Sequence, residues 1–232
     1  MGYLPIFLDV AGRPCIVIGD GEVAEGKVRA LIEAGANVTV VSAAASAVLT
    51  NVADKGELRH VPREYEYGDL HGNYLAYVAS RDPETARRAA EEARELGILI
   101  NIADNPERSN FISPAIVKSG DLQIAISTSG ASPAVARKLR EQMQQRFGPE
   151  YAFLLEIMRR ARRYLRRHQA DQRERARRLN ALAVTLLGSV DALDDAHIDE
   201  ALNRHLEVGM EELDLKSSGD SEPRRAISEI PR

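Results

Sequence analysis

Short apolar runs alternate with amphipathic stretches over the first half of the chain. Four of the runs suit strands buried on both faces of a sheet: Cys15 to Ile18, Val38 to Val41, Tyr74 to Ala79 and Ile98 to Ile102. Residues 58–61 predict a short edge strand, and residues 4–10 predict an extended segment beside the sheet. Strands that alternate with helices imply right-handed βαβ units, so we predict an α/β fold with a Rossmann-type parallel sheet.

The intervening helices have recognisable beginnings and ends. The alanine-rich residues 43–53 predict one helix, and Asp82 is the expected N-cap of another that starts at Pro83 and stops at Gly97. The helix before them should end at Gly35, and its expected apolar stripe consists of Val23, Ala24, Val28, Leu31 and Ile32.

The pattern changes after residue 112. Residues 115–118 and 122–127 are short β-type runs joined by Ser119-Gly120-Asp121, which predicts a hairpin. A helix follows, with Ser132 as N-cap and Pro133 at its first position. Its apolar residues Val135, Leu139 and Met143 recur every four positions, and residues 151–206 read as helical throughout.

These patterns divide the chain into four regions. We expect an NAD-binding Rossmann domain at 1–112, a hairpin and helix that form a dimerisation region at 113–148, and a C-terminal helical domain at 149–213. The polar residues 214–232 predict a disordered tail.

Composition narrows the class of protein. The 232 residues carry a net charge of −4, which gives no overall nucleic-acid signature. The single cysteine, Cys15, falls inside the first strand, which excludes a disulfide framework and fits a reducing cytoplasm. We expect neither a membrane span nor a signal peptide, and the five scattered histidines predict no resident metal site.

The first strand runs into a glycine turn with the spacing G-x-G-x-x-A. Gly19 permits the tight turn, Gly21 lets backbone N–H groups approach a pyrophosphate, and the small Ala24 allows close packing of helix and strand. The pattern therefore predicts a dinucleotide site, with a plain βα turn as the alternative. The second strand ends at Val41-Ser42-Ala43 with neither acid nor arginine, so these residues do not separate NAD from its phosphorylated form.

Asp104 follows the fifth strand and is expected on the same sheet edge as the glycine turn. It is either a catalytic carboxylate or a turn former before Asn105-Pro106. The loop at residues 127–132 brings hydroxyls to a helix N-terminus, which suits an anion or simple N-capping.

Residues 151–178 hold ten arginines against three acids. They form a solvated helix face, a surface that pairs with acids of a partner subunit, or a site for a polyanion. Nucleic acid is not expected there, because aromatic residues are scarce.

Three stretches together resemble a known family. LPIFLDVAGRPCIVIGDGEVAEGKV, NIADNPERSNFISPAIV and LQIAISTSGASPAVARKLRE are similar, in order and spacing, to the dehydrogenase/ferrochelatase part of siroheme synthase. The resemblance covers roughly residues 3–148, without the methyltransferase module of larger members. It implies oxidation of precorrin-2 to sirohydrochlorin with NAD, ferrous iron insertion in some members, and a homodimer whose hairpin and helical regions interlock. We therefore expect the hairpin and the helices after Tyr151, within residues 113–206, to bury their apolar positions mainly against a second copy.

The resemblance also implies roles for individual residues. Asp104 matches the family's catalytic aspartate, and the hydroxyl-rich loop beside the substrate pocket corresponds to Thr128, Ser129, Gly130 and Ser132. The cofactor contacts correspond to Gly19, Gly21, Glu22, Val23, Ser42, Ala43 and Ala44. Ser129 departs from the family, since many relatives have glycine there.

The leading hypothesis is therefore an NAD-dependent precorrin-2 dehydrogenase without nucleic-acid or membrane partners. Two other functions stay open: a dinucleotide-sensing module without catalysis, and a dehydrogenase of an unrelated small acid. A catalytic Asp104 would exclude the sensor, which needs no base.

Overall fold

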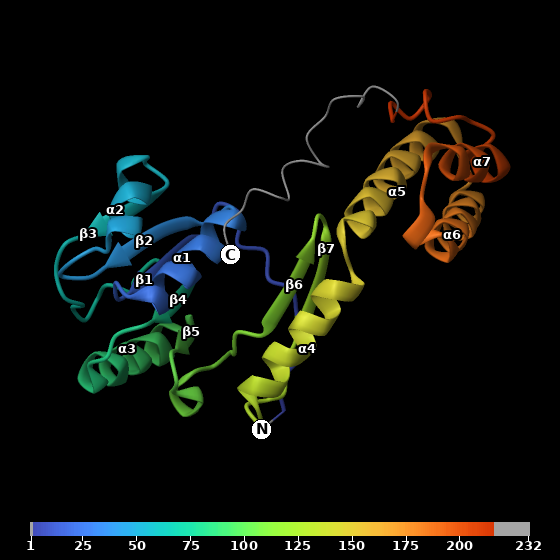
Figure 1. Cartoon of the computed structure of the whole chain (residues 1–232). Coiled ribbons are helices and arrows are strands. Elements are labelled where there is room, and N and C mark those ends of the chain that lie inside the picture. The colour runs from blue at the N-terminus through green and yellow to red at the C-terminus, as the bar shows by residue number, and fades with distance from the viewer. Residues whose placement is uncertain (1, 216–232) are drawn as a thin grey trace. The chain divides into compact units, whose positions relative to one another are not determined.

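A computed structural model of the chain describes residues 2–215. The chain forms two compact units that divide between Ser113 and Pro114, and each is described by itself. The elements of the first unit, coloured blue to green in Figure 1, are β1 (Pro14–Ile18), α1 (Glu22–Glu33), β2 (Asn37–Val41), α2 (Ala47–Asp54), β3 (Leu58–Val61), β4 (Leu75–Val78), α3 (Pro83–Leu96), β5 (Leu99–Ile102) and the 3-10 helix η1 (Pro106–Arg108).

The first unit contains one parallel sheet in the order β3-β2-β1-β4-β5. Successive strands run outward from β1 to β3, and the chain then returns to the other side of β1 with β4. The order therefore reverses between β1 and β4, which is where open α/β sheets bind ligands. The predicted Rossmann-type sheet is confirmed.

Both faces of this sheet are covered by helices. Ile16, Ile18 and Ile100 pack with the alanines of α3 on one face. Val17, Val40 and Leu75 pack with α1 and with Leu49 of α2 on the other. The alternation follows from the two-residue period of a strand, and burial on both faces explains why the strands read as continuous apolar runs.

Local chemistry sets the helix ends. Asp82 caps α3 by accepting hydrogen bonds from the N–H groups of Glu84 and Thr85, and Gly97 ends the helix at φ 69°, both as predicted. The helix expected at 43–53 instead begins at Ala47, because Ser46 is the N-cap and accepts from Leu49 N–H. Val23, placed in the stripe of α1, is 52% exposed, whereas Ala24, Val28 and Leu31 face the sheet.

Residues 4–10, expected as an extended segment beside the sheet, form neither helix nor strand. Leu4, Ile6 and Phe7 are largely exposed, whereas Val10 is buried in the core and Leu8 packs against it. The expected position beside the sheet therefore holds only for the end of the segment, and Leu4, Ile6 and Phe7 do not pack there.

The second unit begins with the predicted hairpin. Its elements, green to red in Figure 1, are β6 (Ala115–Ser119), β7 (Leu122–Ile126), α4 (Pro133–Arg146), α5 (Pro149–His168), α6 (Gln172–Gly188), the 3-10 helix η2 (Val190–Ala192) and α7 (Asp195–Leu206). Helix α4 lies along the hairpin, yet none of its residues is buried, and Val135 and Leu139 are 49% and 38% exposed.

Helices α5, α6 and α7 form a separate core. Ile157, Leu182 and Leu202 are fully buried within it, and Leu213 and Leu215 after α7 also belong to it. We expected the helices after Tyr151 to bury their apolar positions mainly against a second copy, and for α5–α7 this is wrong. The tail prediction for 214–232 also fails at Leu215, which is ordered in this core, while residues 216–232 lie outside the described part of the chain.

Candidate functional site

The glycine turn after β1 has a geometry that only glycine fits at its first position. Gly19 has φ +124°, and a Cβ there would lie 2.8 Å from the carbonyl oxygen of Ala79 at the end of β4. The turn is tied to the second strand by the hydrogen bond from Gly19 N–H to Val41 O at 3.0 Å. It therefore packs tightly at the point where the strand order reverses.

Gly21 is the N-cap of α1 and offers no side chain to its first turn. A Cβ at Gly21 would meet no described atom within 4 Å, so the space beside this backbone is open. The turn thus presents backbone N–H groups at the positive end of the helix dipole, which fits a pyrophosphate. Glu22 and Val23 are exposed in the same turn, so the negative charge of Glu22 opposes an anion that the backbone attracts.

The end of β2 forms the neighbouring part of this edge. Ser42 is only 5% exposed, and its Oγ lies 3.1 Å from Nε2 of His60. Its hydroxyl is thus engaged within the protein, whereas Ala43 and Ala44 are exposed. None of the three carries a charge that could hold a ribose hydroxyl or a phosphate.

Asp104 lies on the same edge, two residues after β5. Ala103 N–H donates to Val78 O at 2.9 Å, which places Asp104 beside the end of β4. The cofactor turn follows β1, the next strand along, so two strand spacings, roughly 10 Å, separate them across the sheet.

The backbone at Asp104 is strained, with φ 57° in the left-handed region. The hydrogen bonds of this turn come from its neighbours: Asn105 accepts from Arg108 N–H at 3.2 Å, and Ser109 donates to Asn105 O at 2.8 Å. Among the described residues none donates a hydrogen bond to the Asp104 carboxylate, which is exposed. A turn former would be expected to use its carboxylate locally, and Asp104 does not.

A further group near this edge was not identified from the sequence. Nζ of Lys27, on α1, donates to Ser113 Oγ at 2.9 Å and lies 4.9 Å from the centre of the Tyr77 ring. Burial lowers the pKa of this lysine and raises that of Tyr77. One basic residue on an amphipathic helix gives no sequence signal, because only the tertiary structure shows that it faces an aromatic ring.

The hydroxyl-rich loop belongs to the second unit, and its groups are largely engaged with one another. Thr128 Oγ1 donates to Ser132 O at 3.1 Å and accepts from Ser132 N–H at 3.2 Å. Ser132 caps α4 through Val135 N–H, as predicted. Ser129 and Gly130 both have positive φ, 52° and 84°, so Ser129 adopts a conformation that glycine takes more readily.

Residues 2–215 contain neither a candidate metal site nor a candidate membrane-spanning helix. No group of three or more His, Cys, Asp or Glu side chains lies close enough to hold a metal ion there. No helix in that range is long and apolar enough to cross a bilayer.

Comparison with known proteins identifies two regions. Residues 6–115 match the family model described as "Putative NAD(P)-binding", and residues 119–146 match the one described as "Sirohaem biosynthesis protein central". The siroheme synthase of Methylococcus capsulatus is 39% identical over 181 residues, which cover 76% of this chain and 35% of that protein. That of Azotobacter vinelandii is 37% identical over 175 residues, covering 75% and 38%.

The chain thus spans about a third of the length of the curated relatives it matches. Among solved structures it is similar to SirC, a precorrin-2 dehydrogenase, with a TM-score of 0.73 and 24% identity over 89% of this chain and all of that one. This likeness shows that the two share a fold. With the two family models and the curated relatives, it shows what the chain is similar to: siroheme synthases over about three quarters of its length, with a region that matches the NAD(P)-binding model followed by one that matches the sirohaem central model.

Proposed function

We propose that the chain oxidises precorrin-2 to sirohydrochlorin with NAD as the hydride acceptor. The curated relatives are siroheme synthases, and the solved structure with the same fold is a precorrin-2 dehydrogenase. The choice of NAD follows the family, since Ser42, Ala43 and Ala44 offer neither an acid nor an arginine to select between the two forms.

One observation carries this proposal: the carboxylate of Asp104 is exposed, held by strained backbone, and without a hydrogen-bond donor in the described chain. Strained backbone of this kind tends to occur at functional sites, where the surrounding structure maintains it. Its place on the edge that carries Gly19 and Gly21 suits a base acting beside the cofactor.

The residues of the chain divide the work of the reaction. The backbone at Gly19 and Gly21 binds the pyrophosphate, and Glu22, Val23, Ser42, Ala43 and Ala44 border the rest of the cofactor. NAD, when bound, would supply the acceptor for the hydride that leaves a ring carbon of the substrate. Asp104 accepts the proton that leaves at the same oxidation, which is why a positioned carboxylate is needed.

The second unit supplies the remaining parts of the proposal. Thr128, Ser129, Gly130 and Ser132 border the tetrapyrrole. The exposed Val135 and Leu139 on α4 pack against a second copy, so the chain is a homodimer. Leu139→Glu should then lower the sedimentation coefficient to that of a monomer, whereas Gln144→Glu, with the same charge change elsewhere on α4, should not.

Two further properties follow the family rather than a single contact. Ferrous iron is a second substrate, and its insertion into sirohydrochlorin releases two pyrrole protons, of which Asp104 accepts one and solvent takes the other. The protein is cytoplasmic, which agrees with Cys15 being a buried, unpaired thiol.

The decisive experiment is visible spectroscopy of precorrin-2 turnover with NAD. Asp104→Asn should retain NAD affinity but lose about 10²–10⁴-fold in rate, the usual contribution of a positioned base. Glu107→Gln removes an exposed acid three residues away and is the matched control, with near-parent turnover expected.

Turnover of Asp104→Asn at the parent rate would refute the assignment of the base. Loss of NAD affinity or a much lower melting temperature would make Asp104 a structural residue. If the parent chain binds NAD but never oxidises precorrin-2, the sensing module or another substrate becomes the better reading.

A further inference from the structure

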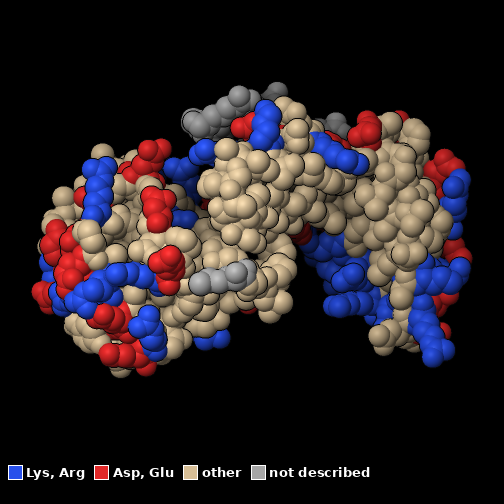
Figure 2. All heavy atoms as spheres, turned by 90° about the horizontal axis from the view of Figure 1, so that it is seen from below, with Lys and Arg blue, Asp and Glu red and all other residues tan. Residues whose placement is uncertain are grey.

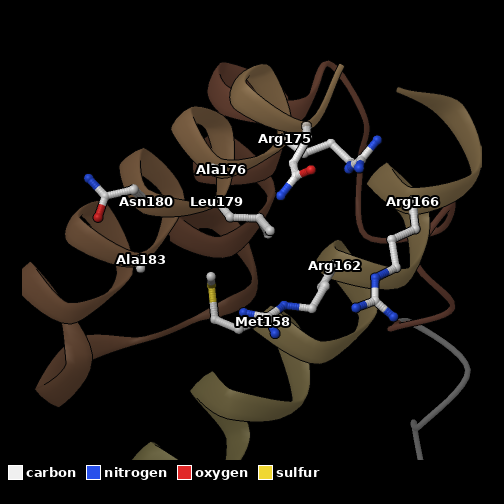
Figure 3. Close-up of a pocket in the computed structure, with 9 residues that line it drawn as sticks. Met158, Arg162, Arg166, Arg175, Ala176, Leu179, Asn180 and Ala183 are labelled. Atoms are coloured by element: carbon white, nitrogen blue, oxygen red, sulfur yellow. The ribbon is translucent and has the colours of Figure 1, made fainter. Parts of the chain in front are cut away.

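A groove of about 480 Å³ lies between α5 and α6 in the second unit. Met158, Arg162 and Arg166 line it from α5, and Arg175, Leu179 and Ala183 line it from α6. Figure 3 shows Met158 and Leu179 turned toward one another, Arg162 beside Met158, and Arg166 and Arg175 farther along the groove. One end of the groove is therefore apolar and the other is basic.

The basic end is not neutralised by the acids nearby. Glu156 pairs with Arg159 and Arg160, and Glu174 pairs with Arg177 and Arg178, all away from the lining. No acid occurs among the lining residues. Figure 2 shows Lys and Arg side chains clustered on this helical part of the molecule.

The three lining arginines keep their charge available. Arg162 and Arg166 are exposed one helical turn apart, and no described acid pairs with either. Arg175 donates to the backbone carbonyls of Gln169 and Ala170 at 2.6 and 2.7 Å, which fixes its guanidinium without cancelling its charge. Such a set suits carboxylates, which accept paired hydrogen bonds from guanidinium.

We propose that this groove binds the carboxylate-bearing edge of a tetrapyrrole macrocycle, as a site separate from the loop at 127–132 and from Asp104. The inference rests on the proposed function, which makes a polycarboxylate tetrapyrrole the substrate and product. The side-chain carboxylates meet the arginines, and the apolar ring edge meets Met158 and Leu179. A site of this kind holds the macrocycle before or after the reaction.

Other polyanions match the lining less well. Single-stranded nucleic acid usually needs aromatic side chains on which bases stack, and the lining has none. Inorganic phosphate would use the arginines but leave the apolar half without a role. A planar apolar ring with anionic substituents uses both.

The test places a reporter at the edge of the groove. The chain has no tryptophan, so Ala170→Trp introduces a single one in the exposed loop whose carbonyl accepts from Arg175. Uroporphyrin, a stable polycarboxylate tetrapyrrole, serves as the probe, and its binding quenches this tryptophan. The same reporter goes into Arg162→Gln/Arg166→Gln and into the matched control Arg163→Gln/Arg167→Gln, which removes two exposed arginines of α5 outside the lining.

Uroporphyrin affinity at the reporter should fall roughly tenfold or more in Arg162→Gln/Arg166→Gln and stay within about twofold in the control. Three results would overturn the inference: no loss of affinity, an equal loss in the control, or a shift from dimer to monomer caused by Arg162→Gln/Arg166→Gln. Tighter competition by single-stranded DNA than by uroporphyrin would also overturn it. NAD binding and precorrin-2 turnover are measured on the parent chain in parallel. If the parent chain neither binds NAD nor oxidises precorrin-2 while uroporphyrin still binds the groove, only the proposed function is refuted.

Discussion

The two units bury apolar residues in different ways. In the first, one sheet is covered on both faces, and the apolar runs of β1, β2 and β4 are almost fully buried. In the second, α5–α7 form their own core while α4, beside the hairpin, leaves Val135 and Leu139 exposed. Apolar periodicity thus predicts the element in both units, but it specifies the packing partner only where the strands are buried on both faces.

The units also differ in how they present a ligand site. The first offers backbone at Gly19 and Gly21 and one exposed carboxylate at Asp104, all at strand ends. The second offers guanidinium groups on helix faces. A site made of backbone N–H groups depends on local conformation, so the spacing of glycines in the sequence can predict it. A site made of side chains depends on which helices pack together.

The largest expected effect tests whether the helical core is independent. Leu182→Ala removes a fully buried side chain and should cost about 2–5 kcal/mol, with faster amide exchange in α5–α7. Val184→Ala, on the same helix but 65% exposed, should change stability little. If exchange in the β1–β5 sheet quickens equally, the two cores unfold as one.

The cofactor turn is tested by comparing Gly21, the N-cap of α1, with Gly26 inside that helix. Gly21→Asp places a carboxylate in open space beside the backbone, so the fold should remain while NAD affinity falls by about a hundredfold or more through charge repulsion. Gly26→Asp makes the same change within the helix, also without a close neighbour, and calorimetry should show near-parent NAD affinity. Unchanged affinity in a folded Gly21→Asp would make this a plain βα turn.

Two glutamates of α3, Glu92 and Glu95, each accept a hydrogen bond from a tyrosine, one in the core and one at the surface. Glu92 is 2% exposed and accepts hydrogen bonds from the Tyr65 hydroxyl and, at 2.9 Å, from Leu70 N–H. Burial and the hydrogen bond to Glu92 raise the pKa of Tyr65. Glu92→Gln should therefore cost about 1–3 kcal/mol in chemical denaturation. Glu95→Gln removes the charge from the corresponding acceptor of the Tyr67 hydroxyl at the surface, where its amide oxygen can still accept, so the cost in stability should be small. A cost equal to that of Glu92→Gln would show that burial is not the cause.

The smallest effect concerns pH. Burial alone would raise the pKa of Asp69, but hydrogen bonds from Arg63 and Glu66 N–H, with the charge of Arg63, lower it. Because the pKa of Asp69 is lower in the folded protein than in the unfolded chain, where it is near 4, the ionised carboxylate stabilises the fold at pH values above the unfolded-state pKa. This stabilisation is lost as the pH falls through the folded-state pKa.

The melting temperature of Asp69→Asn should thus lie slightly below the parent's at pH 7, and the gap should narrow below about pH 4. Glu64→Gln, an exposed acid on the same connection, is the control and should show no such narrowing. A constant gap across this range would mean that Asp69 acts through packing rather than charge.

Much of this molecule was determined by local sequence chemistry. Asp82, Gly97 and Ser132 end or begin helices where predicted, because capping depends on a few neighbouring backbone groups. The spacing of Gly19, Gly21 and Ala24 likewise predicts its turn, since each position has its own steric requirement.

Only the tertiary structure determined which side chains are buried and which of them meet. Val23 is exposed although apolar, and Ser42 is buried against His60 although polar, because each outcome depends on a distant element. Asp104 was placed after its strand by sequence, but its strained backbone and unused carboxylate appear only in the folded turn. The groove of Arg162, Arg166 and Arg175 exists because α5 packs on α6, and the physical reason is general: charge and apolarity belong to residues, whereas a site is a property of their juxtaposition.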